Sequence, residues 1–260
     1  MSANSNAICN CYKQYVMRTF GIIGFPLSHS FSQKYFTQKF LDEYISNALF
    51  LNFPIDSVKD LPKLLKSVSE LKGLAVTIPY KKQVLPYLET TTDDVKAIGA
   101  CNCIKVNSGK MYGFNTDVVG FEKSFVTHLQ PHHTQALILG SGGASAAVEF
   151  VLKKLGIGYT IVSRTVTSSN MLRYEDMNKE VMEKYTVIIN STPLGTYPKV
   201  DEAPLIPYHL LTSKHYLFDL VYNPPLTKFL LLGEEKGAAI QNGYDMLTIQ
   251  AEENWKIWNS

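Results

Sequence analysis

The chain lacks the features that mark membrane proteins and nucleic-acid-binding proteins. No apolar run approaches the roughly 18 residues that a membrane-spanning helix needs. The formal net charge is only +2 over 260 residues, so no broad electrostatic field attracts nucleic acid or a membrane surface. Internal repeats and low-complexity segments are missing as well. What remains is an ordinary folded composition, 45% hydrophobic and 18% charged, with a length that suits one large domain or two modest ones.

Cysteine is scarce, and its spacing is unusual. The four cysteines form two C-x-C pairs, Cys9 with Cys11 and Cys101 with Cys103. Structural zinc sites usually use pairs separated by two to four residues, so we favour free buried thiols over a zinc site. Free thiols are typical of a reducing compartment, and the prediction is therefore a cytoplasmic protein without metal. A zinc-dependent protein stays open as an alternative.

The first sixteen residues lack the apolar core of a secretory signal. Residues 1–16 are polar and precede a second methionine, Met17. We expect this stretch to be a disordered leader or the product of an upstream start.

From Arg18 onward, strand-like and helix-like segments alternate, which predicts an α/β architecture with a largely parallel sheet. The expected strands are 20–24, 48–53, 73–78, 101–106, 110–114, 136–139, 159–163, 186–190, 216–221 and 238–241. The expected helices are 30–44, 58–71, 117–130, 145–155, 226–236 and 244–258. This pattern favours two domains, 17–115 and 116–243, followed by a helix within 244–260.

A glycine-rich turn, Gly140-Ser141-Gly142-Gly143-Ala144-Ser145, follows one predicted strand and opens a helix. That context is typical of a dinucleotide-binding loop, where backbone N–H groups at a helix N-terminus face a pyrophosphate. An ordinary strand-to-helix turn is the alternative. The next strand ends in Ser163-Arg164-Thr165, without the acidic residue that binds the ribose of NAD. Because Arg164 can pair with a 2′-phosphate, we predict NADP as the cofactor.

Two further segments indicate proton-transfer chemistry. Val76-Thr77-Ile78-Pro79-Tyr80-Lys81 places a lysine just after a predicted strand that Pro79 terminates, and Asn115-Thr116-Asp117 places a carboxylate at the start of a helix. A lysine and a carboxylate brought together can pass a proton to and from a substrate oxygen. Separately, Lys81 is an ordinary surface charge and Asp117 an ordinary helix cap. With a dinucleotide nearby, the pair predicts a dehydrogenase that acts on an alcohol or a ketone.

Other polar residues fall at the predicted strand ends and helix starts. Ser30 and Ser32 lie where a helix begins, and there they can either cap the helix or bind a carboxylate. Thr77 lies near the end of the predicted strand 73–78, and Asn102 lies near the start of the predicted strand 101–106. A buried asparagine needs hydrogen-bond partners.

Together these motifs make the chain resemble the shikimate dehydrogenase family, from about Arg18 to Trp258. The motifs that carry the resemblance occur in the family's order: Ser28-His29-Ser30-Phe31-Ser32, 76–81, Gly99-Ala100-Cys101-Asn102, 113–117, 140–145, 163–165, Asp219-Leu220-Val221-Tyr222-Asn223-Pro224 and 243–250. The resemblance implies an α/β fold with an N-terminal substrate domain, a C-terminal Rossmann-type dinucleotide-binding domain, and a last helix that returns to the first domain. It also implies reversible NADPH-dependent reduction of 3-dehydroshikimate to shikimate, on the route to aromatic amino acids.

The resemblance further implies roles for individual residues. Lys81 and Asp117 would be the catalytic pair. The substrate would be bound by Ser30, Ser32, Thr77, Asn102, Asp117, Tyr222 and Gln250. The cofactor would be bound by Gly140, Ser141, Gly142, Gly143, Ala144, Ser163, Arg164, Thr165, Leu220 and Gly243.

Three positions depart from the family pattern. Ala75 and Ser163 stand where the family usually has asparagine, and Gln33 where it usually has proline. Ala75 leaves open a related enzyme that also uses quinate or NAD. A non-catalytic NADP-dependent sensor is the alternative of another class, and the intact Lys81 and Asp117 argue against it. A monomer and a homodimer are equally compatible with the sequence.

Overall fold

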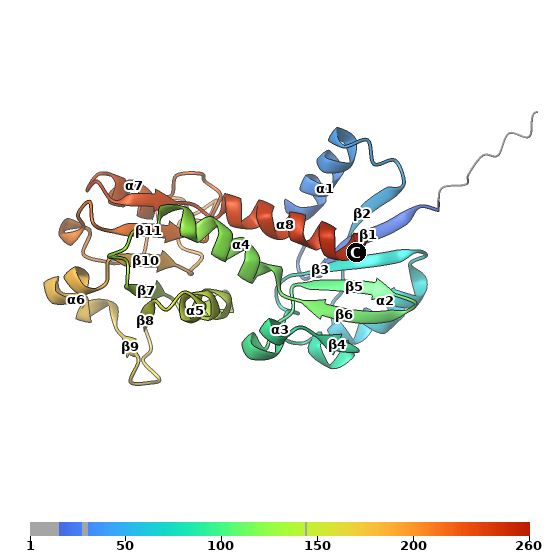
Figure 1. The fold of residues 1–260 in the computed structure, drawn as a ribbon, viewed down its shortest axis with the longest axis horizontal. Coiled ribbons are helices and arrows are strands. Elements are labelled where there is room, and N and C mark those ends of the chain that lie inside the picture. The colour runs from blue at the N-terminus through green and yellow to red at the C-terminus, as the bar shows by residue number, and fades with distance from the viewer. Residues whose placement is uncertain (1–15, 28–30, 144) are drawn as a thin grey trace, which may run out of the picture.

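The computed structural model describes residues 16–27, 31–143 and 145–260, and its strands form two separate six-stranded sheets (Figure 1). The strands of the first sheet are β1 (Arg18–Gly24), β2 (Ala48–Pro54), β3 (Leu71–Val76), β4 (Thr90–Thr91), β5 (Cys103–Asn107) and β6 (Lys110–Phe114). Those of the second are β7 (Gln135–Leu139), β8 (Gly158–Val162), β9 (Met171–Leu172), β10 (Val187–Asn190), β11 (Tyr216–Asp219) and β12 (Ala239–Gln241). The helices are α1 (Phe31–Asp42), α2 (Leu61–Ser67), α3 (Asp93–Ile98), α4 (Thr116–Phe125), α5 (Ser145–Lys154), α6 (Lys179–Lys184), α7 (Lys228–Glu234) and α8 (Tyr244–Asn259).

The second sheet has the strand order of a Rossmann fold. Its order is β12-β11-β10-β7-β8-β9, and every neighbouring pair is parallel. Numbered along the chain, this is the 3-2-1-4-5-6 arrangement, whose order reverses between β7 and β10. Ligands bind at such a reversal because the loops that leave the two strands diverge to opposite faces of the sheet.

The first sheet is largely parallel as well, but it includes antiparallel pairs around β5. Its order is β2-β1-β3-β5-β6-β4. β1, β2 and β3 run parallel, whereas β5 is antiparallel to both β3 and β6. β5 and β6 form a hairpin through Asn107, Ser108 and Gly109, in which the last two residues adopt positive φ angles.

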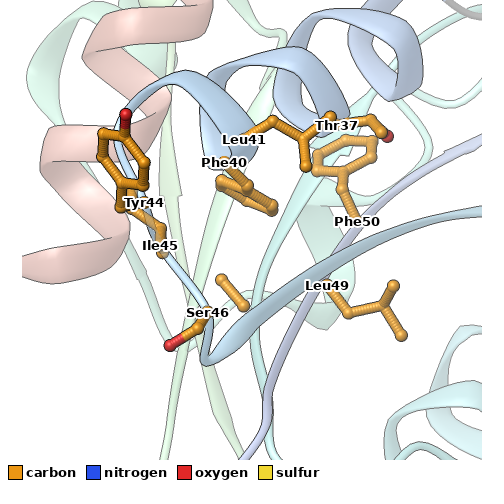
Figure 2. A pocket seen from close by; sticks show the side chains of 9 residues that line it. Thr37, Phe40, Leu41, Tyr44, Ile45, Ser46, Leu49 and Phe50 are labelled. Carbon is orange, nitrogen blue, oxygen red and sulfur yellow. The ribbon is translucent and has the colours of Figure 1, made fainter.

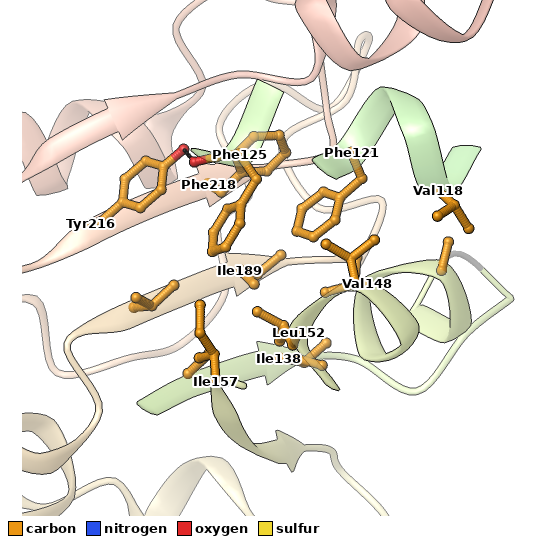
Figure 3. Packing of buried hydrophobic residues seen from close by; sticks show 14 residues of the cluster. Val118, Phe121, Phe125, Ile138, Val148, Leu152, Ile157, Ile189, Tyr216 and Phe218 are labelled. Atoms are coloured by element: carbon orange, nitrogen blue, oxygen red, sulfur yellow. Dashed lines mark hydrogen bonds between the residues drawn. The ribbon is translucent and has the colours of Figure 1, made fainter. Parts of the chain in front are cut away.

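Helix α4 belongs to the core beneath the second sheet (Figure 3). Phe121 and Phe125 stack with their ring centroids 4.9 Å apart, and Phe121 meets Phe218 of β11 edge to face at 5.1 Å. Tyr216 reaches the same cluster and donates its hydroxyl to the Phe125 carbonyl at 3.2 Å. Burial of these large rings holds α4 against β11 and thereby fixes where α4 begins.

The last helix returns to the first sheet, as expected. In Figure 1, α8 lies beside α4 and ends close to β1, β3 and β5. Trp258 donates its indole N–H to the Ile104 carbonyl at 3.1 Å. Near the start of α8, the absence of a side chain at Gly120 allows α4 and α8 to approach closely. A Cβ on Gly120 would lie 2.5 Å from the Met246 carbonyl oxygen.

Several expected boundaries are wrong. The helix predicted over 58–71 is a 3-10 turn at Val58–Asp60 followed by α2, and β3 already begins at Leu71. Pro62 starts the true helix, and the extended backbone of Val68 ends it. The short elements α3, α6, β4 and β9 were not expected, since two to six residues carry too little hydrophobic periodicity to be detected. Asn102 precedes β5 instead of lying within a strand.

Cys101 and Cys103 are buried free thiols, and burial raises the pKa of Cys101 to about 11. The other cysteine pair lies outside the described residues. Among residues 16–27, 31–143 and 145–260, no group of three or more His, Cys, Asp or Glu side chains could hold a metal ion. No helix in these ranges is long and apolar enough to cross a membrane.

Candidate active site and cofactor site

Lys81 and Asp117 form an ion pair between the first sheet and α4. Lys81 Nζ lies 2.6 Å from Asp117 Oδ2, and the two side chains keep 29% and 18% of their exposure. Partial burial strengthens the attraction relative to open water, while the remaining exposure leaves room for a ligand. The lysine ammonium is thus held in place with donor capacity to spare.

The two residues reach this position through different local structures. Lys81 lies in a turn after β3, and its carbonyl accepts the Cys101 N–H at 2.8 Å. Asp117 lies in the first turn of α4, which Asn115 caps by accepting the Val118 N–H. A carboxylate in this turn also interacts favourably with the helix dipole. The sequence spacing of 36 residues becomes a direct contact because β5 and β6 fold back between them.

Asn102 is almost fully buried and is bound to the start of α4. Its Oδ1 accepts the Thr116 N–H at 2.6 Å, and its Nδ2 donates to Thr116 Oγ1 at 3.0 Å. Thr116 in turn donates to Asn254 Oδ1 of α8 at 2.7 Å, and Asn254 donates to Gln250 at 3.3 Å. Asn102 and Gln250, from distant parts of the sequence, therefore belong to one buried network beside Asp117.

The remaining predicted substrate residues are placed less closely together. Ser32 is buried in the first turn of α1. Thr77 follows β3, and its methyl group fills the space that the missing side chain of Gly24 leaves. Tyr222 meets Phe31 edge to face, with ring centroids 5.8 Å apart. Burial raises the pKa of Tyr222, so its hydroxyl stays a neutral donor. Ser30 lies outside the described residues.

A cavity of about 650 Å³ opens at the reversal point of the second sheet. Five predicted cofactor residues line it: Gly140, Ser141, Gly142, Ser163 and Arg164. Gly140 has φ +97, and a Cβ there would lie 2.9 Å from Thr192, so this turn requires glycine. Gly142 and Gly143 face open space, which leaves the backbone accessible.

These features fit a dinucleotide. The turn presents glycine backbone at the start of α5, whose N-terminus favours negative charge. Arg164 is exposed beyond β8, where a further anionic group can reach it.

The other predicted cofactor residues do not line this cavity in the described part of the chain. Gly143 and Thr165 are sequence neighbours of lining residues, and Ala144 lies outside the described residues. Leu220 and Gly243 instead contact each other beyond β11, because a Cβ on Gly243 would lie 2.3 Å from the Leu220 carbonyl oxygen. This contact lies two strands away from the glycine turn in the same sheet.

Several lining residues were missed from the sequence. They are Arg173, Tyr174, Glu175, Ser191, Thr192, Pro193, Leu194 and Leu205. A signal existed for Ser191 and Thr192, which are polar residues directly after the buried strand β10. Arg173 follows a strand of only two residues, and Leu205 lies in an irregular segment, so neither carried a local signal.

The structure shows the contacts of the three residues that depart from the family pattern. Ala75 is buried in an apolar cluster with Phe36 and Trp258. Gln33 accepts a hydrogen bond from Asn52 Nδ2 at 2.8 Å, which ties the start of α1 to β2. Thr165 donates its N–H to Ser163 Oγ, so Ser163 shapes the turn that carries Arg164.

A second concavity lies between the end of α1 and β2 (Figure 2). Its lining is mostly apolar, with Phe40, Leu41, Tyr44, Leu49 and Phe50 prominent. Tyr44 is its one titratable side chain among the described lining residues. It therefore offers no chemistry comparable to that of Lys81 and Asp117.

The fold and the two sites define an α/β enzyme of the dinucleotide-dependent oxidoreductase class. Residues 22–104 match the family described as "Shikimate dehydrogenase substrate binding domain". Shikimate dehydrogenase (NADP(+)) of Aquifex aeolicus is 37% identical over 92% of this chain and 90% of its own length, and that of Clostridium beijerinckii is 36% identical over 93% and 92%.

A solved structure agrees with these relatives. The Thermus thermophilus enzyme, in complex with NADP(H) and shikimate, superposes with a TM-score of 0.79 at 28% identity and covers 93% of both chains. The chain belongs to the shikimate dehydrogenase family.

Proposed function

We propose that this protein catalyses the reversible NADPH-dependent reduction of 3-dehydroshikimate to shikimate, a step toward aromatic amino acids. The observation that carries the proposal is the 2.6 Å contact between Lys81 and Asp117. The relatives' names and the ligands of the Thermus structure support the choice of substrate and cofactor.

Bound NADPH would supply a hydride to the carbonyl carbon of the substrate. Negative charge then develops on the carbonyl oxygen. The Lys81 ammonium stabilises that charge and donates the proton that completes the hydroxyl group. Asp117 orients Lys81 through their hydrogen bond, and in the reverse direction the Lys81 amine takes the proton back.

The other predicted residues have supporting roles in this proposal. Ser30 and Ser32 bind the substrate carboxylate, while Thr77, Asn102, Asp117, Tyr222 and Gln250 bind the ring hydroxyls. Gly140 to Ala144 approach the pyrophosphate, Ser163 to Thr165 bind the adenosine end, and Leu220 and Gly243 flank the remaining part of the cofactor. The proposed domains are 17–115 with the returning helix, and 116–243. We also propose a cytoplasmic monomer or homodimer.

The test is an absorbance assay of cofactor reduction with shikimate and quinate, each combined with NADP and NAD. Turnover with shikimate and NADP, and little with the other pairs, is expected. Rapid turnover with quinate or NAD would instead indicate the related enzyme that also uses quinate or NAD. Tight NADP binding without turnover in any pair would contradict the catalytic role and favour a sensor.

A further inference from the structure

Arg173 shares the cofactor cavity with Arg164, although the two come from different strands. β8 and β9 run parallel, with Val162 opposite Leu172, and the Ser163 N–H donates to the Leu172 carbonyl at 2.9 Å. Both arginines therefore follow the carboxyl ends of neighbouring strands. Among the described residues that line the cavity, these two are the only cations.

The backbone at Arg173 is held before any ligand arrives. Its N–H donates to Asp176 Oδ2 at 2.9 Å, and its carbonyl accepts the Asp176 N–H at 3.1 Å. The next residue, Tyr174, packs against the apolar cluster on the other face of the second sheet, which includes Leu137 and Ile188. Burial raises the pKa of Tyr174 while the positive charge of Arg164 opposes the rise, which places Tyr174 within the electrostatic reach of Arg164. The backbone that carries the Arg173 side chain therefore needs no ordering when an anion binds.

Among the residues that the structure describes, the Arg173 side chain has one ion-pair partner, and that contact is weak. Its Nη1 lies 3.3 Å from Glu175 Oε1, and the two side chains are 59% and 72% exposed. Such an exposed pair contributes little stability and is easily exchanged. A phosphate monoester carries about −1.5 to −2 charges at neutral pH and binds arginine in two-pronged fashion, so it is the stronger partner.

We propose that Arg173 is the second cation that recognises the 2′-phosphate of the NADP adenosine, beside Arg164, and that Glu175 is its exchangeable partner when no phosphate is bound. The proposal rests on the proposed use of NADP. It makes Arg173 a determinant of cofactor choice that lies outside the Ser163-Arg164-Thr165 motif.

Calorimetry on the purified full-length chain tests this without turnover. The probes are adenosine 2′,5′-bisphosphate and 5′-AMP, which differ by the 2′-phosphate alone. Arg173→Gln is expected to weaken bisphosphate binding by about ten- to a hundredfold, because a hydrogen-bonded charge pair is lost, and to leave AMP binding within about twofold. Glu175→Gln is expected to tighten bisphosphate binding by about two- to fivefold.

Two further variants serve as controls. Arg173→Lys keeps the charge without the two-pronged geometry, and it should retain part of the preference for the bisphosphate. Lys179→Gln removes one positive charge from α6 outside the cavity and should change neither affinity.

The outcomes distinguish a failure of the role proposed for Arg173 from a failure of the NADP assignment. If wild-type protein binds both probes equally, the NADP assignment fails, and the proposal with it. If wild-type protein prefers the bisphosphate and Arg173→Gln keeps that preference, only the role of Arg173 is overturned. An equal loss for both probes in Arg173→Gln would also overturn it, since it would show a role in the shape of the cavity.

Discussion

Thr116 donates a 2.7 Å hydrogen bond to Asn254 Oδ1, and this contact joins the first residue of α4 to the middle of α8. Thr116 is also bound to Asn102, so three separate segments meet at one buried hydroxyl group. Asp117 is the next residue along the chain. The orientation of the proposed catalytic carboxylate therefore depends on a helix more than 130 residues away in the sequence.

Asn254→Ala should destabilise the protein by about 1–3 kcal/mol, because it removes a buried hydrogen-bond partner of Thr116 and of Gln250. Urea unfolding measures the loss. Lys256→Ala on the exposed side of the same helix is the matched control and should change the free energy of unfolding by less than about 0.5 kcal/mol. Equal unfolding midpoints for Asn254→Ala and wild-type protein would contradict the structural role of the network.

Lys81→Ala should lower kcat by at least about 100-fold, because the variant loses the proton donor that the proposed mechanism requires. NADP affinity should stay nearly unchanged, since Lys81 does not line the cofactor cavity. Steady-state kinetics and a cofactor titration measure the two effects. Lys82→Ala removes the exposed neighbouring lysine and should retain normal turnover. Near-normal kcat in Lys81→Ala would rule out its proposed role.

Asp219 makes stability depend on pH in the direction opposite to that of most carboxylates. Burial raises its pKa to about 6, despite hydrogen bonds from Thr227, Val221 and Asn190 that favour the charged form. The native state thus keeps this proton at pH values where the unfolded chain, with a pKa near 4, has lost it. The stabilising contribution of Asp219 is therefore full below about pH 4 and is lost as the pH rises through 6.

Asp219→Asn should remove this dependence, because the amide does not titrate. The free energy of unfolding of wild-type protein, relative to this variant, should fall by on the order of 3 kcal/mol between about pH 4 and 7. Urea unfolding across that range provides the measurement, with the exposed Asp201→Asn as the control. A difference between wild-type protein and Asp219→Asn that stays constant with pH would refute the raised pKa.

Gly73→Ala should loosen the end of α8. A Cβ at this position in β3 would lie 2.3 Å from the Trp258 ring, which is buried and cannot turn away freely. The expected cost is about 1–3 kcal/mol. Because the clash is with the indole, Gly73→Ala should cost less in a Trp258→Leu background, and a double-mutant cycle measures that coupling. Additive effects of the two substitutions would show that the clash is relieved elsewhere.

The proposed catalytic pair and five residues that line the cavity were selected from the sequence because their signals are local. Lys81 follows a strand that is readily recognised, and Asp117 starts a helix with an amphipathic pattern. Gly140 lies between a strand and a helix, the local context that a dinucleotide-binding turn requires. Asn254 gave no such signal, since a polar residue in an amphipathic helix is ordinarily exposed. Its burial results from the close approach of α4 and α8 at Gly120.

Local sequence signals were enough to predict the α/β class, the order of the main elements and the glycine-rich turn, and to select the proposed proton-transfer residues. These depend on hydrophobic periodicity and on turn chemistry, which act over a few residues. Long-range packing, by contrast, paired β5 with β3 in the antiparallel sense, joined Thr116 to Asn254 by a hydrogen bond, and brought Arg173 into one cavity with Arg164. Such contacts depend on how whole sheets and helices pack, and that packing is set by many weak interactions between residues far apart in the chain.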